Sequence, residues 1–128
     1  MIKRAIQFTV WLPNKPGSAA KFLSSFGKTN LLAISVLDSV DICTVRLVAH
    51  NANRAARILA KAGICNSTQD MLVVDLPNLP GALQKLCGKL ARAKVNIDYM
   101  YGSAGARTAE APVVLRVSSI SKAVRALK

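Results

Sequence analysis

A short phrase with the residue types needed to bind an anion occurs twice in this chain. NKPGS at positions 14–18 returns as NLPGA at positions 78–82, so the second glycine follows the first after 64 residues (81 − 17 = 64). Each copy stands where an apolar run ends and an amphipathic segment begins, which predicts a strand followed by a helix. Glycine is a poor helix former, but without a Cβ it lets a small anion approach the N–H groups of a helix N-terminus. The phrase therefore indicates a carboxylate site in each copy.

A purely structural interpretation of the phrase is also open. Asn-x-Pro-Gly makes a good turn and helix cap without any ligand. Pro16 and Pro80 fit the first helical position, where a missing N–H costs nothing. Asn14 and Asn78 can either cap the helix or donate to a ligand.

The similarity between the two halves continues after the phrase. Each half shows an amphipathic helix, an extended run, a turn, a second strand and a second helix. Apolar residues of the first helix fall on one face at Ala19, Phe22, Leu23 and Phe26, and at Leu83, Leu86, Cys87 and Leu90. The other matched elements are Leu31–Leu37 with Val95–Tyr101, the turn 38–41 with the longer loop 102–110, and Thr44–Val48 with Val114–Ser118. The second helices are expected to start after Asn51 or Asn53, and after Ser119 or Ser121.

This order of elements predicts an α+β protein made of two ferredoxin-like (βαββαβ) units, each with an antiparallel sheet covered by helices on one face. The units are expected at residues 1–68 and 69–128, with a short strand at 64–68 completing the first. The second unit lacks its own last strand, so that edge is exposed, paired with a partner or filled by strand exchange. Units this small favour pairing of the copies and a homodimer.

Composition narrows the class of protein. The chain has 128 residues, is 52% hydrophobic and has a formal net charge of +12. No apolar run approaches the roughly 20 residues of a membrane-spanning helix, so we expect a soluble, cytoplasmic protein without a membrane partner. Cys43, Cys65 and Cys87 are widely spaced and suggest buried free thiols; neither a disulfide framework nor a metal site is indicated. No cofactor is expected.

Catalysis finds little support in the sequence. His50 has no paired nucleophile or acid, the thiols have no activating base, and no glycine-rich phosphate fingerprint is present. We therefore expect a protein that is not an enzyme and has no catalytic residues.

Three stretches carry a resemblance to a known family. The Asn-x-Pro-Gly turn, the run KVNIDYMYG at 94–102 and the stretch LDSVDICTVRLV at 37–48, with Asp38, Asp41 and Arg46, resemble the ACT domain twice over. The whole chain is similar to the small stand-alone proteins made of two ACT domains. The resemblance implies a regulatory module that binds a free amino acid at domain or subunit interfaces near the strand-to-helix turns. Because the sequence shows no catalytic partner to regulate, either an enzyme or other protein elsewhere is regulated, or the function is buffering or sensing.

The resemblance also implies which residues hold the ligand. The ligand carboxylate is expected on the N–H groups of the glycine and of the residue after it, and its ammonium on Asp38, a strand carbonyl or Asp98 of an adjoining unit. The second copy keeps the family's Asn-Ile pair at 96–97, whereas the first has Leu-Ala at 32–33, and Lys15 adds positive charge. The expected ligand-binding residues are Asn14, Lys15, Pro16, Gly17, Ser18, Leu32, Asp38, Asn78, Pro80, Gly81, Ala82, Asn96 and Ile97.

The charge supports an alternative function. The chain has 18 Lys and Arg but 6 Asp and Glu, and the bases gather in the expected helices while the acids lie in strands and turns. A basic helical face can attract nucleic acid or an acidic protein partner. The aromatic pattern of RNA-reading ferredoxin-like domains is missing, so nucleic acid is the less favoured partner. A solvated basic face without a partner is nevertheless the best single explanation of the charge.

Overall fold

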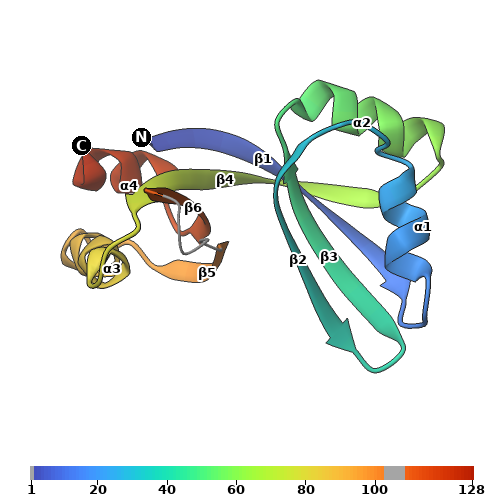
Figure 1. Cartoon of the computed structure of the whole chain (residues 1–128). Helices are drawn as coiled ribbons and strands as arrows, with labels where there is room; N and C mark the ends of the chain where they lie inside the picture. Colours follow the sequence, from blue (N-terminus) through green and yellow to red (C-terminus); the bar gives the residue numbers. More distant parts are fainter. Residues whose placement is uncertain (1, 103–108) are drawn as a thin grey trace. The chain divides into compact units, whose positions relative to one another are not determined.

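The computed structural model describes residues 2–102 and 109–128, which hold six strands and four helices. Six residues of the loop expected at 102–110, residues 103–108, lie outside the described part. The elements in chain order are β1 (Ile2–Pro13), α1 (Ser18–Ser24), β2 (Leu31–Ser39), β3 (Ile42–Ala49), α2 (Ala52–Lys61), β4 (Asn66–Pro77), α3 (Ala82–Arg92), β5 (Ile97–Gly102), β6 (Glu110–Val117) and α4 (Ile120–Leu127). Hydrogen-bonded strands follow the order β2-β3-β1-β4-β6-β5 (Figure 1). The predicted α+β fold is confirmed.

The chain forms two compact units. The first unit, Ile6–Gln69, contains β2, β3, most of β1, the start of β4, and the helices α1 and α2. β3 is antiparallel to both β1 and β2, so that Val10 lies opposite Val45 and Val45 opposite Val36. Alternate strand residues point to the same face. The helices cover that face, and the buried core there comprises Phe8, Val10, Phe22, Phe26, Val45, Leu47, Ala49, Ala55 and Leu59.

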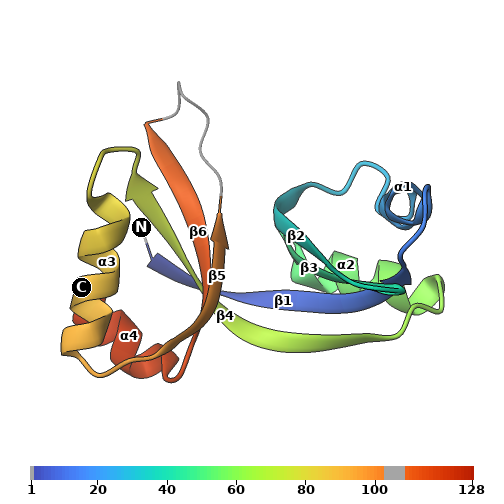
Figure 2. The same ribbon diagram turned by 90° about the horizontal axis from the view of Figure 1, so that it is seen from below.

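The second unit consists of the start of the chain, through Ala5, together with Asp70–Lys128. Helices α3 and α4 lie on one face of β4, β5 and β6 (Figure 2). Its core comprises Leu72, Val74, Leu86, Leu90, Val95, Leu115, Val117 and Ala123. β1 is the neighbour of β4 in the sheet. Residues Ile2–Ala5 therefore occupy the place of the fourth strand that the second copy of the repeat lacks.

β1 and β4 are longer than a single repeat requires. Each has 12 residues, and each contributes to both units. The expected short strand at 64–68 and the first strand of the second copy are one continuous strand, Asn66–Pro77. A continuous strand keeps the backbone hydrogen-bonding groups on both sides of the repeat boundary in one ladder.

In the first helix of each unit, fewer of the regularly spaced apolar residues are buried than the sequence predicts. Phe22 and Phe26 of the first unit are 4% and 3% exposed, and their rings meet edge to face at 5.3 Å. Leu23, at 37%, and Leu83, at 44%, are exposed although they share the apolar spacing. The core therefore uses one row of each helix, and the neighbouring row remains on the surface.

The described residues contain no helix that is both long enough and apolar enough to cross a membrane. All three thiols are free, but Cys65 is exposed and Cys43 and Cys87 are half-buried. The expectation that these thiols are buried is therefore wrong for Cys65. Cys65 immediately precedes β4, in the exposed segment that follows α2.

Candidate functional site: the two strand-to-helix turns

The repeated phrase folds the same way in both units. Ser18 N–H donates to the carbonyl of Lys15 at 3.3 Å, and Ala82 N–H donates to that of Leu79 at 3.2 Å. Gly17 and Gly81 have φ of 87° and 85° with ψ near zero. Proline at the second position and glycine with positive φ at the third define a type II β-turn. Turn geometry is thus sufficient to explain why both copies have Pro-Gly at these positions.

The prolines are not the first residues of the helices. The helices begin at Ser18 and Ala82, with Gly17 and Gly81 as N-caps in left-handed conformation. Pro16 and Pro80 precede the caps, so the expectation that they occupy the first helical position is wrong. Their fixed φ is used by the turn instead.

The N-termini of α1 and α3 lack the side-chain caps that α2 and α4 have. Asn51 accepts a hydrogen bond from Arg54 N–H at 3.0 Å, and Ser119 accepts one from Lys122 N–H at 3.3 Å. No side chain caps α1 or α3 in the described part of the chain, and no acidic residue lies in their first turns. The space beside both glycines is open to 4 Å. The N–H groups of Ser18 and Ala82, on which the ligand carboxylate is expected, already donate within the turns. The uncapped donors at the positive end of each helix dipole are therefore those of the other first-turn residues.

In the first unit, Asn14 connects the turn to the β2–β3 hairpin. Its side-chain amide donates to the carbonyl of Val40 at 2.8 Å, and its side-chain oxygen accepts from the Cys43 thiol at 3.4 Å. Its backbone N–H donates to the carbonyl of Asp41 at 2.8 Å. Cys43 is the cross-strand partner of Asp38. The fold therefore brings Asn14 and Asp38 to the same end of the sheet, on opposite sides of β3. Asn14 holds the hairpin and does not cap α1.

In the second unit a cavity lies directly beside the turn. Asn78 N–H donates to the carbonyl of Ala109 at 2.9 Å, which repeats the bond made by Asn14. The cavity has a volume of about 250 Å³, and its lining is Leu76, Pro77, Asn78, Leu79, Ala82, Leu83, Gly102, Ala111 and Val113. A Cβ at Gly102 would lie 2.7 Å from the carbonyl oxygen of Pro112. Glycine at this position lets β5 and β6 approach closely next to the cavity.

The remaining predicted residues lie at the other end of each sheet. Ile97 pairs with Val117 on β6, whereas Pro77, next to the turn, pairs with Glu110. Seven residues of strand separate these positions (117 − 110 = 7), a span of about 20 Å. Asn96 is engaged there: its amide donates to Asp98 at 2.8 Å, and its N–H donates to Ser118 Oγ at 2.9 Å. Within the second unit, Asn96 and Ile97 therefore do not meet Gly81.

Leu32 occupies the corresponding place in the first unit. It lies at the start of β2, beside a register shift between Leu31 and Ala33, while Asp38 lies at the other end of the same strand. Six residues of strand separate the two (38 − 32 = 6), again about 20 Å. The first unit by itself does not combine Leu32 with the turn.

The sequence reasoning missed the apolar wall of the second unit's cavity. The apolar spacing predicts that Leu83 lies on the buried face of the helix, yet it is 44% exposed and lines the cavity. Ala111 and Val113 reach the cavity from β6, after the loop whose length differs between the copies. Because the loop changes the offset between the two halves, comparing the repeats does not indicate that Ala111 and Val113 lie near the turn.

Comparison with known proteins gives the context of this geometry. The structure is similar to that of protein BT0572 from Bacteroides thetaiotaomicron, with 29% sequence identity, a TM-score of 0.88, and coverage of 98% of this chain and 88% of that chain. It shares its fold with the regulatory subunit of aspartate kinase from Thermus thermophilus in ligand-free form, at 16% identity, a TM-score of 0.67, and coverage of 99% and 95%. The regulatory subunit of aspartate kinase from Thermus flavus is similar at 17% identity and a TM-score of 0.60, with coverage of 99% and 93%.

No curated protein matches the chain in a sequence comparison. The sequence does match the family described as the ACT domain pair over residues 3–125. This match spans both units and both turns, which confirms the resemblance inferred from the repeated phrase, and the chain belongs to the ACT domain pair family.

Proposed function

We propose that this chain is a non-catalytic regulatory protein that binds a free amino acid at its strand-to-helix turns. The observation that carries the proposal is the contrast between the four helices. α2 and α4 satisfy first-turn N–H groups with their own side chains, whereas α1 and α3 leave theirs uncapped beside open space. An anion is the natural partner of such a terminus, and the carboxylate of an amino acid fits it.

The second unit offers room for the rest of the ligand. Leu76, Leu79, Leu83 and Val113 line the cavity beside its turn, and this lining favours an amino acid with an apolar side chain. In the first unit, Asp38 is the acceptor for the ligand's ammonium group. In the second unit a main-chain carbonyl takes that role, since the described lining residues include no acid.

The fold of the regulatory subunits of aspartate kinase supports a regulatory role. In this proposal the ligand stabilises one arrangement of the protein over another, and a partner protein responds to the shift.

We also propose a homodimer through β2. β2 is the last strand in the sheet order, and its Val36 and Leu37 are 53% and 58% exposed. An edge strand with exposed apolar side chains is a template for pairing with a second chain. An isologous pairing of two β2 edges would join their backbone hydrogen-bonding groups and would give Val36 and Leu37, on opposite faces of the sheet, apolar neighbours across the interface.

The amino-acid proposal is tested by thermal shift with each of the twenty amino acids at fixed salt. A ligand that binds only the folded state must raise the melting temperature. The site is then tested with Gln84→Glu, which keeps the shape of an exposed residue in the first turn of α3 and adds a negative charge. The new carboxylate suits the helix dipole but competes with the ligand for the N–H donors.

We expect Gln84→Glu to keep or slightly raise stability and to weaken the ligand's thermal shift. Ser121→Asp, which adds the same charge in the first turn of α4, is the matched control and should leave the shift unchanged. If no amino acid stabilises the protein and oligonucleotides bind with a steep salt dependence, the basic helices carry the function instead.

A further inference from the structure

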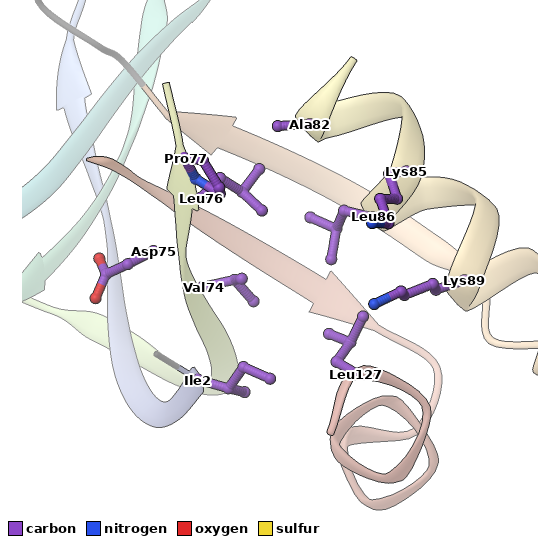
Figure 3. Close-up of a pocket in the computed structure, with 10 residues that line it drawn as sticks. All are labelled: Ile2, Val74, Asp75, Leu76, Pro77, Ala82, Lys85, Leu86, Lys89 and Leu127. Carbon is purple, nitrogen blue, oxygen red and sulfur yellow. The ribbon is translucent and has the colours of Figure 1, made fainter. Parts of the chain in front are cut away.

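A second kind of cavity occurs in both units at equivalent positions. In the second unit it is a cleft of about 300 Å³ between the end of β4, one side of α3 and the end of α4 (Figure 3). In the first unit a cleft of about 360 Å³ lies between the end of β1, α1 and the residues after α2. Six positions recur with the repeat spacing of 64, namely Leu12/Leu76, Pro13/Pro77, Ser18/Ala82, Lys21/Lys85, Phe22/Leu86 and Ser25/Lys89. A hollow reproduced in two diverged copies is a property of the fold.

In the second unit this cleft adjoins the cavity beside the turn and shares Leu76, Pro77 and Ala82 with it, but the other lining residues differ. The cleft of the first unit likewise includes Lys15 and Ser18 of the turn. In the second unit, Leu83 and Gly102 line the turn cavity, whereas Lys85, Lys89 and Leu127 line the cleft. Substitutions at the two lysines therefore leave the lining of the turn cavity intact.

Each cleft combines apolar walls with two lysines. Lys85 and Lys89 line the cleft of the second unit, and Lys15 and Lys21 line that of the first. Figure 3 shows Lys89 extending from α3 toward the hollow, with its nitrogen between Leu86 and Leu127. Lys89 is half-buried, so its stem packs on apolar surface while its charge stays accessible.

Negative charge does not balance these lysines inside the clefts. The described lining of the first cleft includes no acid, and that of the second includes only Asp75. Val74 and Leu76 face the helices in the core of the unit. Asp75 must then face the other side of the strand, and Figure 3 shows its carboxylate turned away from the hollow. The charged side chains that face each cleft are therefore lysines.

We propose that these clefts bind an aliphatic carboxylate that has no ammonium group. The lysines attract the carboxylate, and the leucine, isoleucine and phenylalanine side chains cover the chain of the acid. A zwitterionic amino acid is disfavoured, because its ammonium would meet two lysines without an acid to accept it. A hollow of about 300 Å³ holds roughly ten water-sized groups, which matches the heavy atoms of octanoate.

The test uses isothermal titration of the full chain with sodium octanoate at low salt. We expect octanoate to bind and 2-aminooctanoate, which has the same chain plus an ammonium group, to bind about tenfold more weakly or not at all. Equal affinity for the two compounds, or no octanoate binding, would overturn the proposal.

Variants assign the binding to the clefts. Lys85→Met, Lys89→Met and Lys21→Met keep the apolar stem and remove one charge each, and each should weaken octanoate binding to its own cleft by about fivefold. Lys122→Met, on the exposed surface of α4, is the matched control and should have no effect. Unchanged octanoate affinity in a variant that combines all three lysine substitutions would also overturn the proposal. The thermal shift given by an amino acid should persist in these variants, which separates this site from the one at the turns.

Discussion

The side-chain amide of Asn14 donates a hydrogen bond to the carbonyl oxygen of Val40 at 2.8 Å. This bond joins the β1–α1 turn to the β2–β3 hairpin of the first unit. Val40 has a φ of 58° and is 83% exposed, a conformation that is unfavourable for a β-branched residue. The bond from Asn14 helps to hold the hairpin in that conformation, so the turn and the hairpin are stabilised together.

Replacement of Asn14 should lower the stability of the first unit. We expect Asn14→Ala to cost about 1 kcal/mol of unfolding free energy, because it removes a hydrogen bond between distant parts of the chain. Urea unfolding followed by circular dichroism measures the change. Asn66→Ala is the control: its side chain bonds the nearby carbonyl of Ile64 at 3.1 Å, and a smaller loss is expected. Equal unfolding midpoints for Asn14→Ala and the unchanged protein would contradict the prediction.

A side chain at Gly81 should lower the stability of the protein although the space around this residue is open. Its φ of 85° is strained for any residue with a Cβ, so Gly81→Ala should lose about 1 kcal/mol. Gly88→Ala in the middle of α3 should gain about 0.5 to 1 kcal/mol, because alanine is the better helix former. The added Cβ at position 88 meets only Arg92 Nη1, at 3.5 Å. Both changes are measured by thermal unfolding, and a neutral Gly81→Ala would refute the role assigned to the turn.

Lys94, just after the end of α3, should be replaceable by glycine with a gain in stability. Lys94 has a φ of 59°, and the N–H groups of Lys94 and Val95 donate back to Ala91 and Leu90 at 3.0 and 2.9 Å. This is the Schellman pattern, in which glycine is preferred. Gly63, with a φ of 68°, fills the same position after α2.

We therefore expect Lys94→Gly to raise the unfolding free energy by about 1 kcal/mol. Lys94→Gln removes the charge without relieving the backbone and should be nearly neutral. The reciprocal change, Gly63→Lys, should be destabilising. Chemical denaturation measures the unfolding free energy of the three variants. A loss of stability in Lys94→Gly would contradict the prediction.

The proposed dimer should depend on the edge strand β2. Val36→Lys places a charge on an apolar edge and should convert the dimer to a monomer, since a lysine at an edge opposes strand pairing. Leu23→Lys, at an exposed apolar position on α1, should leave the dimer intact. Sedimentation equilibrium gives the mass of each variant. A dimer that survives Val36→Lys would move the interface away from β2.

The repeat made much of the fold predictable. Periodic apolar positions and the repeated phrase indicate both the type and the order of the elements, because these depend on local spacing. The turns could be predicted for a similar reason. A type II turn requires a positive φ at its third position, which favours glycine at Gly17 and Gly81.

Other features could not be predicted because they depend on contacts between distant residues. The sequence does not show that Ile2–Ala5 lies beside β4 in the second unit, since strand pairing is set by the whole sheet. It also gives no sign that Asn14 would bond Val40 instead of capping α1, because both partners were available to the same amide.

The sequence by itself determined the duplicated ferredoxin-like plan and the two Pro-Gly turns, since local periodicity and backbone dihedral preferences are properties of short stretches. Only the tertiary structure decided which residues share a site. It placed Asn96, Ile97 and Leu32 about 20 Å from the turns, and it brought Leu83, Ala111 and Val113 to one cavity. The reason is that strand register and helix packing, which the spacing of residues does not encode, set the distances between side chains.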